Sequence, residues 1–157
     1  MRLNLLVLLI AVGILPAIAQ VKLTEVDLTV NGIRSGSTIQ QVRKLGKPVR
    51  ITSLGHNDCS DSFERTFVLS GLKIGVLGSK NGRQGNVYSL EVTSQKWKIA
   101  PGIRIGVKRE TVLRKYGRPV SVEKGKLVYV TKDNLGWVGF HFRNGRLTRA
   151  EMMETLC

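Results

Sequence analysis

Acidic residues are scarce in this sequence. Its 157 residues include 11 Asp and Glu against 25 Lys and Arg, which gives a formal net charge of +14 at pH 7. Catalysis by paired carboxylates therefore has little material to draw on. Both halves are basic, since residues 20–97 hold 11 basic and 6 acidic side chains and residues 98–157 hold 13 and 5. Such a distribution is expected of a protein that meets an anionic partner, although solubility alone would also account for it.

Aromatic residues and the common catalytic motifs are also lacking. Phe, Trp and Tyr make up 6% of the chain, and they do not alternate with basic residues as they do in proteins that stack nucleic-acid bases. Neither a G-x-x-x-x-G-K-S/T loop nor a G-x-S-x-G turn occurs, which excludes phosphate-loop enzymes and hydrolases with a serine elbow. We therefore expect no nucleic acid, cofactor or metal as a ligand.

Only one long apolar run is present, from Leu3 to Ile18, and it ends at Ala17-Ile18-Ala19, a pattern typical of signal-peptide cleavage. An uncleaved membrane anchor is the alternative, but the run is shorter than the roughly 20 residues that span a bilayer, and Pro16 interrupts it. We predict that residues 1–19 are a signal peptide. The exported chain, residues 20–157, then has a charge of +13, because Arg2 is lost from a chain of +14. We expect it in the periplasm or the medium, without a transmembrane segment.

The sequence has two cysteines, Cys59 and Cys157. In an oxidising compartment a disulfide between them is the first expectation, and a free thiol is the alternative. Cys59 lies in a polar stretch with His56 and Asp58, so a thiol- or metal-dependent enzyme that uses the loop from His56 to Asp61 is a further hypothesis. The spacing of these residues fits no standard zinc pattern.

Four short blocks recur in the same order along the chain, which predicts a single domain of two repeats, at about residues 24–92 and 97–157. The paired blocks are Gly32–Gly36 with Gly102–Gly106, Val42–Val49 with Leu113–Val120, Lys80–Arg83 with Arg143–Arg146, and Val87–Val92 with Leu147–Met152. The third pair contains Asn-Gly, which favours tight hairpin turns.

A short helix is predicted in each repeat. In the first, Ser37 and Gln40 form a capping box, and Ile39, Val42 and Leu45 line one face. Glycine followed two residues later by proline ends both helices, which leaves about 8–10 residues in each. The second helix buries Val112, Leu113 and Tyr116 and lacks a good capping residue.

The rest of each repeat has strand patterns, and Val21–Val30 predicts a leading strand. From Trp137 to Arg143 apolar and polar residues alternate, so Val138, Phe140 and Phe142 should face the core. The sequence thus predicts the α+β class: two tandem units, each a short helix followed by an antiparallel meander, which share one sheet and place both helices on one face.

The opposite, open face of that sheet is the candidate binding surface, with Trp137, His141 and Arg143 on it. Trp97, between two lysines, is a further candidate binding residue, and the alternative for it is a buried plug.

Each repeat contains G-I-R-x-G, then a short helix that ends at Leu or Tyr before Gly-Lys/Arg-Pro, and then a meander with Asn-Gly-Arg. This pattern, given twice, resembles the beta-lactamase inhibitor protein family and the related small outer-membrane assembly lipoproteins. The resemblance covers most of residues 24–157. Members of the inhibitor family bind a partner enzyme across a concave sheet face, through aromatic contacts and an acidic hairpin. Here the hairpins are basic, so the resemblance implies the fold and an exported recognition module.

We therefore expect an exported, non-catalytic binding module that recognises an acidic protein or an anionic envelope polymer through the open sheet face. The alternatives are the enzyme described above and a structural envelope protein without a discrete ligand.

Overall fold

A computed structural model describes residues 26–132 and 134–156. The predicted signal peptide at residues 1–19, and Cys157, lie outside the described residues. Neither of the two described helices is long and apolar enough to cross a bilayer.

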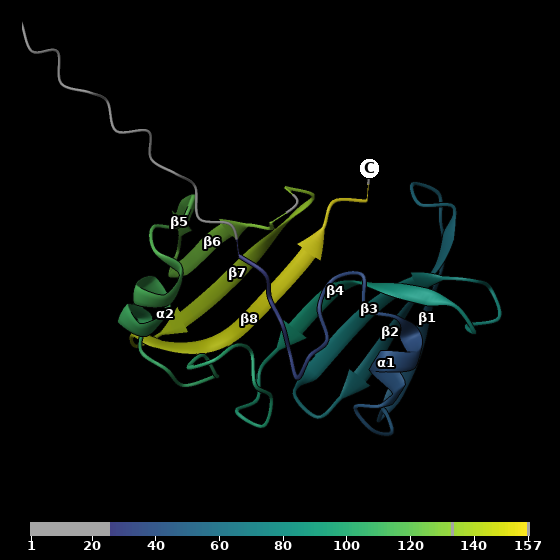
Figure 1. The fold of residues 1–157 in the computed structure, drawn as a ribbon, viewed down its shortest axis with the longest axis horizontal. Helices are drawn as coiled ribbons and strands as arrows, with labels where there is room; N and C mark the ends of the chain where they lie inside the picture. The colour runs from purple at the N-terminus through teal and green to yellow at the C-terminus, as the bar shows by residue number, and fades with distance from the viewer. Residues whose placement is uncertain (1–25, 133, 157) are drawn as a thin grey trace, which may run out of the picture.

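Eight strands form one antiparallel sheet, in the order β1-β2-β3-β4-β8-β7-β6-β5 (Figure 1). The strands are β1 Arg50–Asn57, β2 Ser62–Leu69, β3 Leu72–Gly78, β4 Gly85–Val92, β5 Ser121–Glu123, β6 Lys126–Val130, β7 Gly136–Arg143 and β8 Arg146–Glu154. The helices are α1 Ile39–Arg43 and α2 Arg109–Tyr116. The last strand, β8, lies in the middle of the sheet beside β4, so β1 and β5 become the two edges.

The predicted fold class is wrong: the protein is mainly β. The helices contain only 5 and 8 residues, whereas the described chain has eight strands in one sheet, so it is not built as two helix-plus-meander units. The first helix ends at Arg43, before the turn that Leu45 was expected to complete. Helices this short contribute little stability of their own, so the fold depends on the sheet and on the core beneath it.

The cap of α1 lies one residue later than predicted. Thr38 is the N-cap, its hydroxyl accepts a hydrogen bond from the Gln41 backbone N–H at 3.3 Å, and the Gln41 side chain accepts one from the Thr38 N–H at 2.7 Å. Ser37 is occupied elsewhere, because its hydroxyl accepts from the Arg34 N–H at 3.0 Å and closes the preceding turn. In α2 the N-cap is Lys108 and has no side-chain cap, as the sequence predicted.

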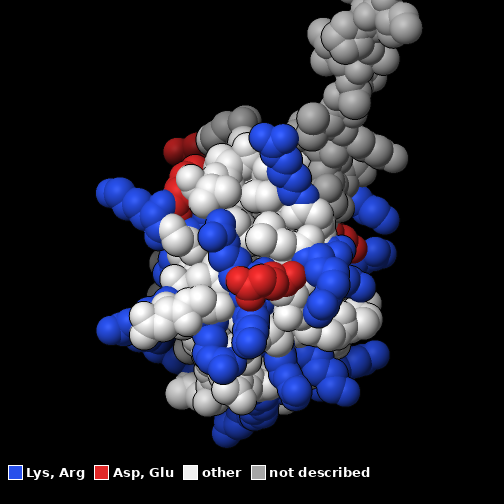
Figure 2. Space-filling model, turned by 90° about the vertical axis from the view of Figure 1, so that its left-hand side faces the viewer, with Lys and Arg blue, Asp and Glu red and all other residues white. Residues whose placement is uncertain are grey.

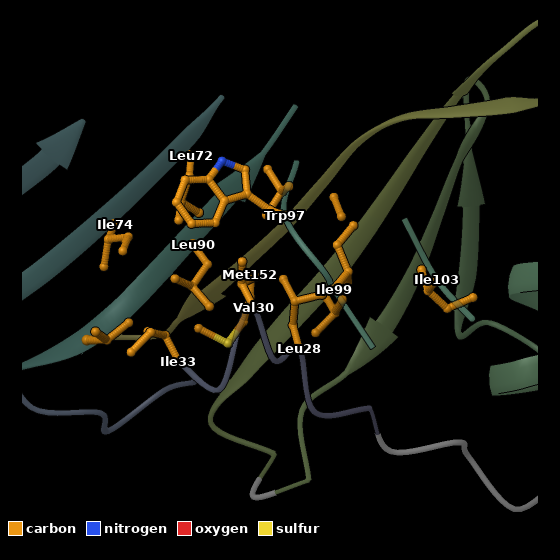
Figure 3. Close-up of a cluster of buried hydrophobic side chains, with 14 of the residues drawn as sticks. Leu28, Val30, Ile33, Leu72, Ile74, Leu90, Trp97, Ile99, Ile103 and Met152 are labelled. Atoms are coloured by element: carbon orange, nitrogen blue, oxygen red, sulfur yellow. The ribbon is translucent and has the colours of Figure 1, made fainter. Parts of the chain in front are cut away.

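One continuous hydrophobic core lies between the sheet and the helices. The first described segment crosses the middle of the sheet in front of the β4–β8 pair (Figure 1), and its Leu28 lies beside Ile99 and Met152 in Figure 3. The part of the predicted leading strand that the structure describes is therefore not a strand. Val26 and Leu28 are buried in a segment that forms no strand ladder. Its Val26 N–H donates a single hydrogen bond to the Val130 carbonyl of β6 at 3.0 Å, and Val30 forms a single bridge to Ile33.

Both helices contribute side chains to this core, so the sheet has a helix face and an open face. Ile39 of α1 and Tyr116 of α2 belong to the same buried cluster. On β7, Val138 and Phe140 are fully buried against it, which confirms the predicted alternation, and Phe142 is partly buried. The side chains between them, of Trp137 and His141, lie on the open face.

Trp97 is a core residue. It is 3% exposed, and its indole N–H donates a hydrogen bond to the Ser70 carbonyl at 2.8 Å. Figure 3 shows its ring among Leu72 and Leu90. Of the two interpretations of Trp97, the structure agrees with the buried plug. Trp97 is therefore not a candidate binding residue.

Candidate functional site

Five side chains gather on the open face where β6, β7 and β8 lie side by side. We call Lys126, Trp137, His141, Arg149 and Glu151 the Glu151 cluster. The strand register brings them together, because His141 lies opposite Lys126 on one side and opposite Arg149 on the other.

The single carboxylate of the cluster contacts all three of its basic side chains. Glu151 Oε1 lies 2.6 Å from His141 Nε2 and 3.1 Å from Lys126 Nζ, and its Oε2 lies 3.3 Å from Arg149 Nε. The Lys126 ammonium also stands 3.9 Å from the centre of the Trp137 ring, within range of a cation–π interaction. The cluster therefore presents three basic groups and one aromatic ring against one acid.

These contacts keep Glu151 ionised. Partial burial opposes ionisation, but hydrogen bonds from His141 and Lys126, together with the charges of His141 and Arg149, outweigh it and lower the pKa of Glu151. An ionised Glu151 holds the surrounding donors in place, so the cluster is organised before any partner arrives.

A glycine makes room for the cluster. Gly139 lies on the open face of β7, opposite Glu151 of β8. A Cβ at this position would stand 2.5 Å from Lys126 Cε and 3.1 Å from both Glu151 Oε1 and Trp137 Cζ3. A side chain at position 139 would therefore force the end of the Lys126 side chain to shift.

The sequence identified part of this cluster. Trp137 and His141 were predicted on the open face and belong to the cluster. Arg143 is exposed at the end of β7, but no ion pair among the described residues joins it to Glu151. Glu151 and Arg149 were missed, although alternation along β8 would have placed both on one face with Met153. Lys126 was missed as well, because the contact of Glu151 with Lys126 depends on the pairing of three strands, which the sequence pattern does not contain.

A second group lies on the open face across β2, β3 and β4. The Tyr88 ring covers Gly75, where a Cβ would stand 2.6 Å from Tyr88 Cε1, and the Tyr88 hydroxyl donates a hydrogen bond to Glu64. Burial and this hydrogen bond raise the pKa of Tyr88 to about 12, so it remains a donor at neutral pH. The sequence missed Tyr88 because a bulge between Gly75 and Val76 shifts the register at β4 and turns its ring away from the core.

The ionised groups on the open face are largely paired with one another. Lys73 of β3 lies 2.9 Å from Glu91 of β4, and Lys126 and Arg149 both contact Glu151. The excess of positive charge is therefore concentrated on other parts of the surface.

The loop between β1 and β2 contains the alternative site. The imidazole of His56 contacts two exposed carboxylates, with Nδ1 2.9 Å from Asp58 and Nε2 3.0 Å from Asp61. Hydrogen bonds to Asp58 and then to Asp61 raise the pKa of His56. Cys59 is not a free thiol. Within residues 26–132 and 134–156, no group of three or more His, Cys, Asp or Glu side chains could hold a metal ion.

Comparison of the chain with protein-family models, with curated proteins and with solved structures gives no significant match.

Proposed function

We propose that the chain is an exported, non-catalytic binding module that recognises an acidic partner protein through the open face of its sheet. The observation that carries this proposal is the Glu151 cluster. One internal carboxylate holds Lys126, His141 and Arg149 on a face that neither helix covers. Lys126 and Arg149 have further N–H groups besides those that contact Glu151, and a carboxylate from a partner would accept from these beside the Trp137 ring.

The composition of this face favours a protein over an anionic polymer. Trp137 provides a partly exposed aromatic ring, and Met153 is 44% exposed at the end of β8. Aromatic residues, methionine and arginine are enriched in protein interfaces. A polymer with many negative charges would be bound best by an excess of positive charge, whereas the charges on this face are paired.

The arrangement around His56 gives less support to the enzyme alternative. Both of its ring nitrogens contact carboxylates, so neither is directed at Cys59, and Cys59 is not a free thiol. A nucleophilic cysteine requires a thiolate and a nearby base.

Affinity capture from an envelope extract tests the proposal. The bait is the chain of residues 20–157, and the variant carries Trp137→Ala and Lys126→Gln. The control carries Val122→Ala and Lys124→Gln, two exposed positions on and beside the edge strand β5. We expect a partner protein that the control retains, that the open-face variant loses by more than about tenfold, and that elutes in about 1 M salt, which screens charges beyond a few ångströms.

Other results would contradict the proposal. Equal capture by the variant and the control would show that the open face is not the binding surface. Retained material that resists protease and carries no protein would favour an anionic polymer. No specifically retained material would favour a structural envelope protein.

A further inference from the structure

A groove of about 830 Å³ lies on the helix face, away from the Glu151 cluster. The segment 27–32, the loop 98–107 and the end of α2 line it, and Figure 3 shows Ile99 and Ile103 of that loop. Two of these walls are joined directly, because the Asn31 N–H donates to the Lys98 carbonyl at 2.9 Å and the Lys98 N–H donates to Asn31 Oδ1 at 3.0 Å. The groove is therefore largely formed in advance and has a volume typical of small-molecule sites.

Three exposed cations line the groove: Lys98, Arg104 and Lys115. In the described part of the chain none of the three forms an ion pair. The one acid in the lining, Asp27, lies 3.6 Å from Arg34. The side of the molecule that carries α2 shows many Lys and Arg side chains and few acidic ones (Figure 2). The groove thus differs from the open face, where charges are paired, and it favours an anion.

Tyr116 of α2 lines the same groove and has an unused donor. The residue is 8% exposed, and its hydroxyl is buried without a hydrogen-bond partner among the described residues. Burial and the nearby Asp27 raise its pKa to about 12, so the hydroxyl keeps its proton at neutral pH. Its ring stacks on Phe140 at 5.3 Å, which fixes its position. A buried donor without an acceptor costs free energy and calls for an explanation.

We infer that this groove binds a small amphipathic anion, with a phosphate or carboxylate head and a short apolar chain. The head would lie among Lys98, Arg104 and Lys115, and one of its oxygens would accept the Tyr116 hydrogen bond. The apolar chain would lie along Ala100, Pro101 and Val107, which give the groove its apolar wall. This site lies apart from the open face, so the test of the groove does not depend on the proposed partner protein.

Titration calorimetry of the chain of residues 20–157 with monomeric decyl phosphate tests the inference. Inorganic phosphate supplies the head alone, and decyl maltoside supplies the chain with a neutral head. We expect decyl phosphate to bind at least about tenfold more tightly than either, because both groups contribute. Equal binding of decyl maltoside, or no binding of decyl phosphate, would overturn the inference.

Flotation with vesicles distinguishes a free anion from a lipid as the source of this chemistry. Binding to phosphatidylglycerol vesicles but not to phosphatidylcholine vesicles, abolished by Lys98→Gln with Lys115→Gln, would assign the groove to a membrane lipid. Decyl phosphate binding without vesicle binding would assign it to a soluble amphiphile.

Two variants separate binding from folding. Tyr116→Phe keeps the ring and removes only the hydroxyl, so we expect an unchanged or higher melting temperature together with about tenfold weaker binding of decyl phosphate. Lys98→Gln with Lys115→Gln should weaken binding further, whereas Lys44→Gln with Lys47→Gln, exposed cations outside the groove, removes the same charge and should not. Equal affinity of Tyr116→Phe and the parent, or equal loss in both lysine pairs, would contradict the site.

Discussion

Glu151 is the residue on which the organisation of the open-face cluster depends. Its side chain is 16% exposed and contacts Lys126, His141 and Arg149. We expect Glu151→Gln to lower the free energy of unfolding at pH 7 by about 1–2 kcal/mol, because charged hydrogen bonds are lost in a partly buried place. Urea unfolding measures this, and Glu91→Gln, in the more exposed pair with Lys73, should cost less than about 0.5 kcal/mol.

The pH dependence of stability provides a second test of the role of Glu151. The pKa of Glu151 is lower in the folded chain than its ordinary value of 4.5. Its contribution is therefore present above pH 4.5 and is lost as the pH falls below that value toward the folded pKa. The difference between the parent and Glu151→Gln should shrink across that range. A difference that is constant from pH 7 to pH 3 would show that the carboxylate does not hold the cluster.

His56 is expected to titrate above its ordinary pKa of 6.5. Hydrogen bonds to Asp58 and Asp61 favour the protonated ring, so its stabilising contribution is present below pH 6.5 and is lost as the pH rises through the folded pKa. NMR titration of the ring protons should show the raised pKa, and Asp58→Asn with Asp61→Asn should return it to about 6.5. Identical titration of the two proteins would refute this assignment. A protonated ring is a poor base and a poor metal ligand, which bears on the enzyme alternative.

At the residue scale, the pattern within one strand predicted the sheet face on which a side chain lies, but not the side chains that it contacts. Alternation along a single strand was enough to place Trp137 and His141 opposite Val138 and Phe140. The role of Glu151 arises from three strands in register, and the position of Tyr88 arises from a bulge. Neither cross-strand register nor a bulge is encoded in a pattern that is read within one segment.

At the element scale, the N-termini of the two helices differ in their capping. Thr38 caps α1 through a reciprocal pair of hydrogen bonds with Gln41, whereas Lys108 offers α2 no cap and places a positive charge at its positive end. We expect Thr38→Ala to destabilise the fold by about 1 kcal/mol and Lys108→Thr to stabilise it by roughly 0.5 kcal/mol. Thermal unfolding of both variants checks this, and shifts of the same sign would contradict the comparison.

The individual strands were easier to predict from the sequence than the fold class of the whole chain. Lys126–Val130, which is rich in β-branched and aromatic residues, forms β6, and the Asn144-Gly145 turn joins β7 to β8 with both residues at positive φ, 51° and 70°. The error in fold class came from treating two short amphipathic segments as equal in weight to the strands, although α1 has only 5 residues and α2 only 8. A glycine and a proline follow each helix closely, so strands account for most of the described residues that lie in helices and strands. The sequence could not predict that β4 and β8 are neighbours in the sheet, because their pairing joins distant parts of the chain.

At the scale of the whole molecule, the positive charge is unevenly distributed. Lys73, Lys126 and Arg149 of the open face are paired with Glu91 and Glu151. The lining of the helix-face groove keeps its cations unpaired within the described chain. A net charge of +14 therefore does not by itself place an acidic partner on either face. The two faces favour different chemistry: an aromatic and ion-paired surface for a protein, and a cationic groove for a small anion.

A disulfide between Cys59 and Cys157 is the prediction that involves the whole chain. Cys59 lies in the loop that joins β1 to β2 at one edge of the sheet, and Cys157 follows β8, the strand that lies next to β4 in its middle. Since Cys59 is not a free thiol and the sequence has one other cysteine, a bond between the two would tie the edge hairpin to the end of the chain.

Closing a loop of this length restricts the unfolded chain and should stabilise the fold by on the order of 4 kcal/mol. Peptide mapping without reductant should recover a linked peptide that contains both cysteines. Cys59→Ser with Cys157→Ser should lower the melting temperature, while the contacts of the Glu151 cluster, which involve neither residue, should remain. Reductant should reproduce the lower melting temperature in the parent and leave the double variant unchanged. Two alkylatable thiols in protein taken from its native compartment would contradict the bond, and would return Cys59 to consideration as a reactive group beside His56.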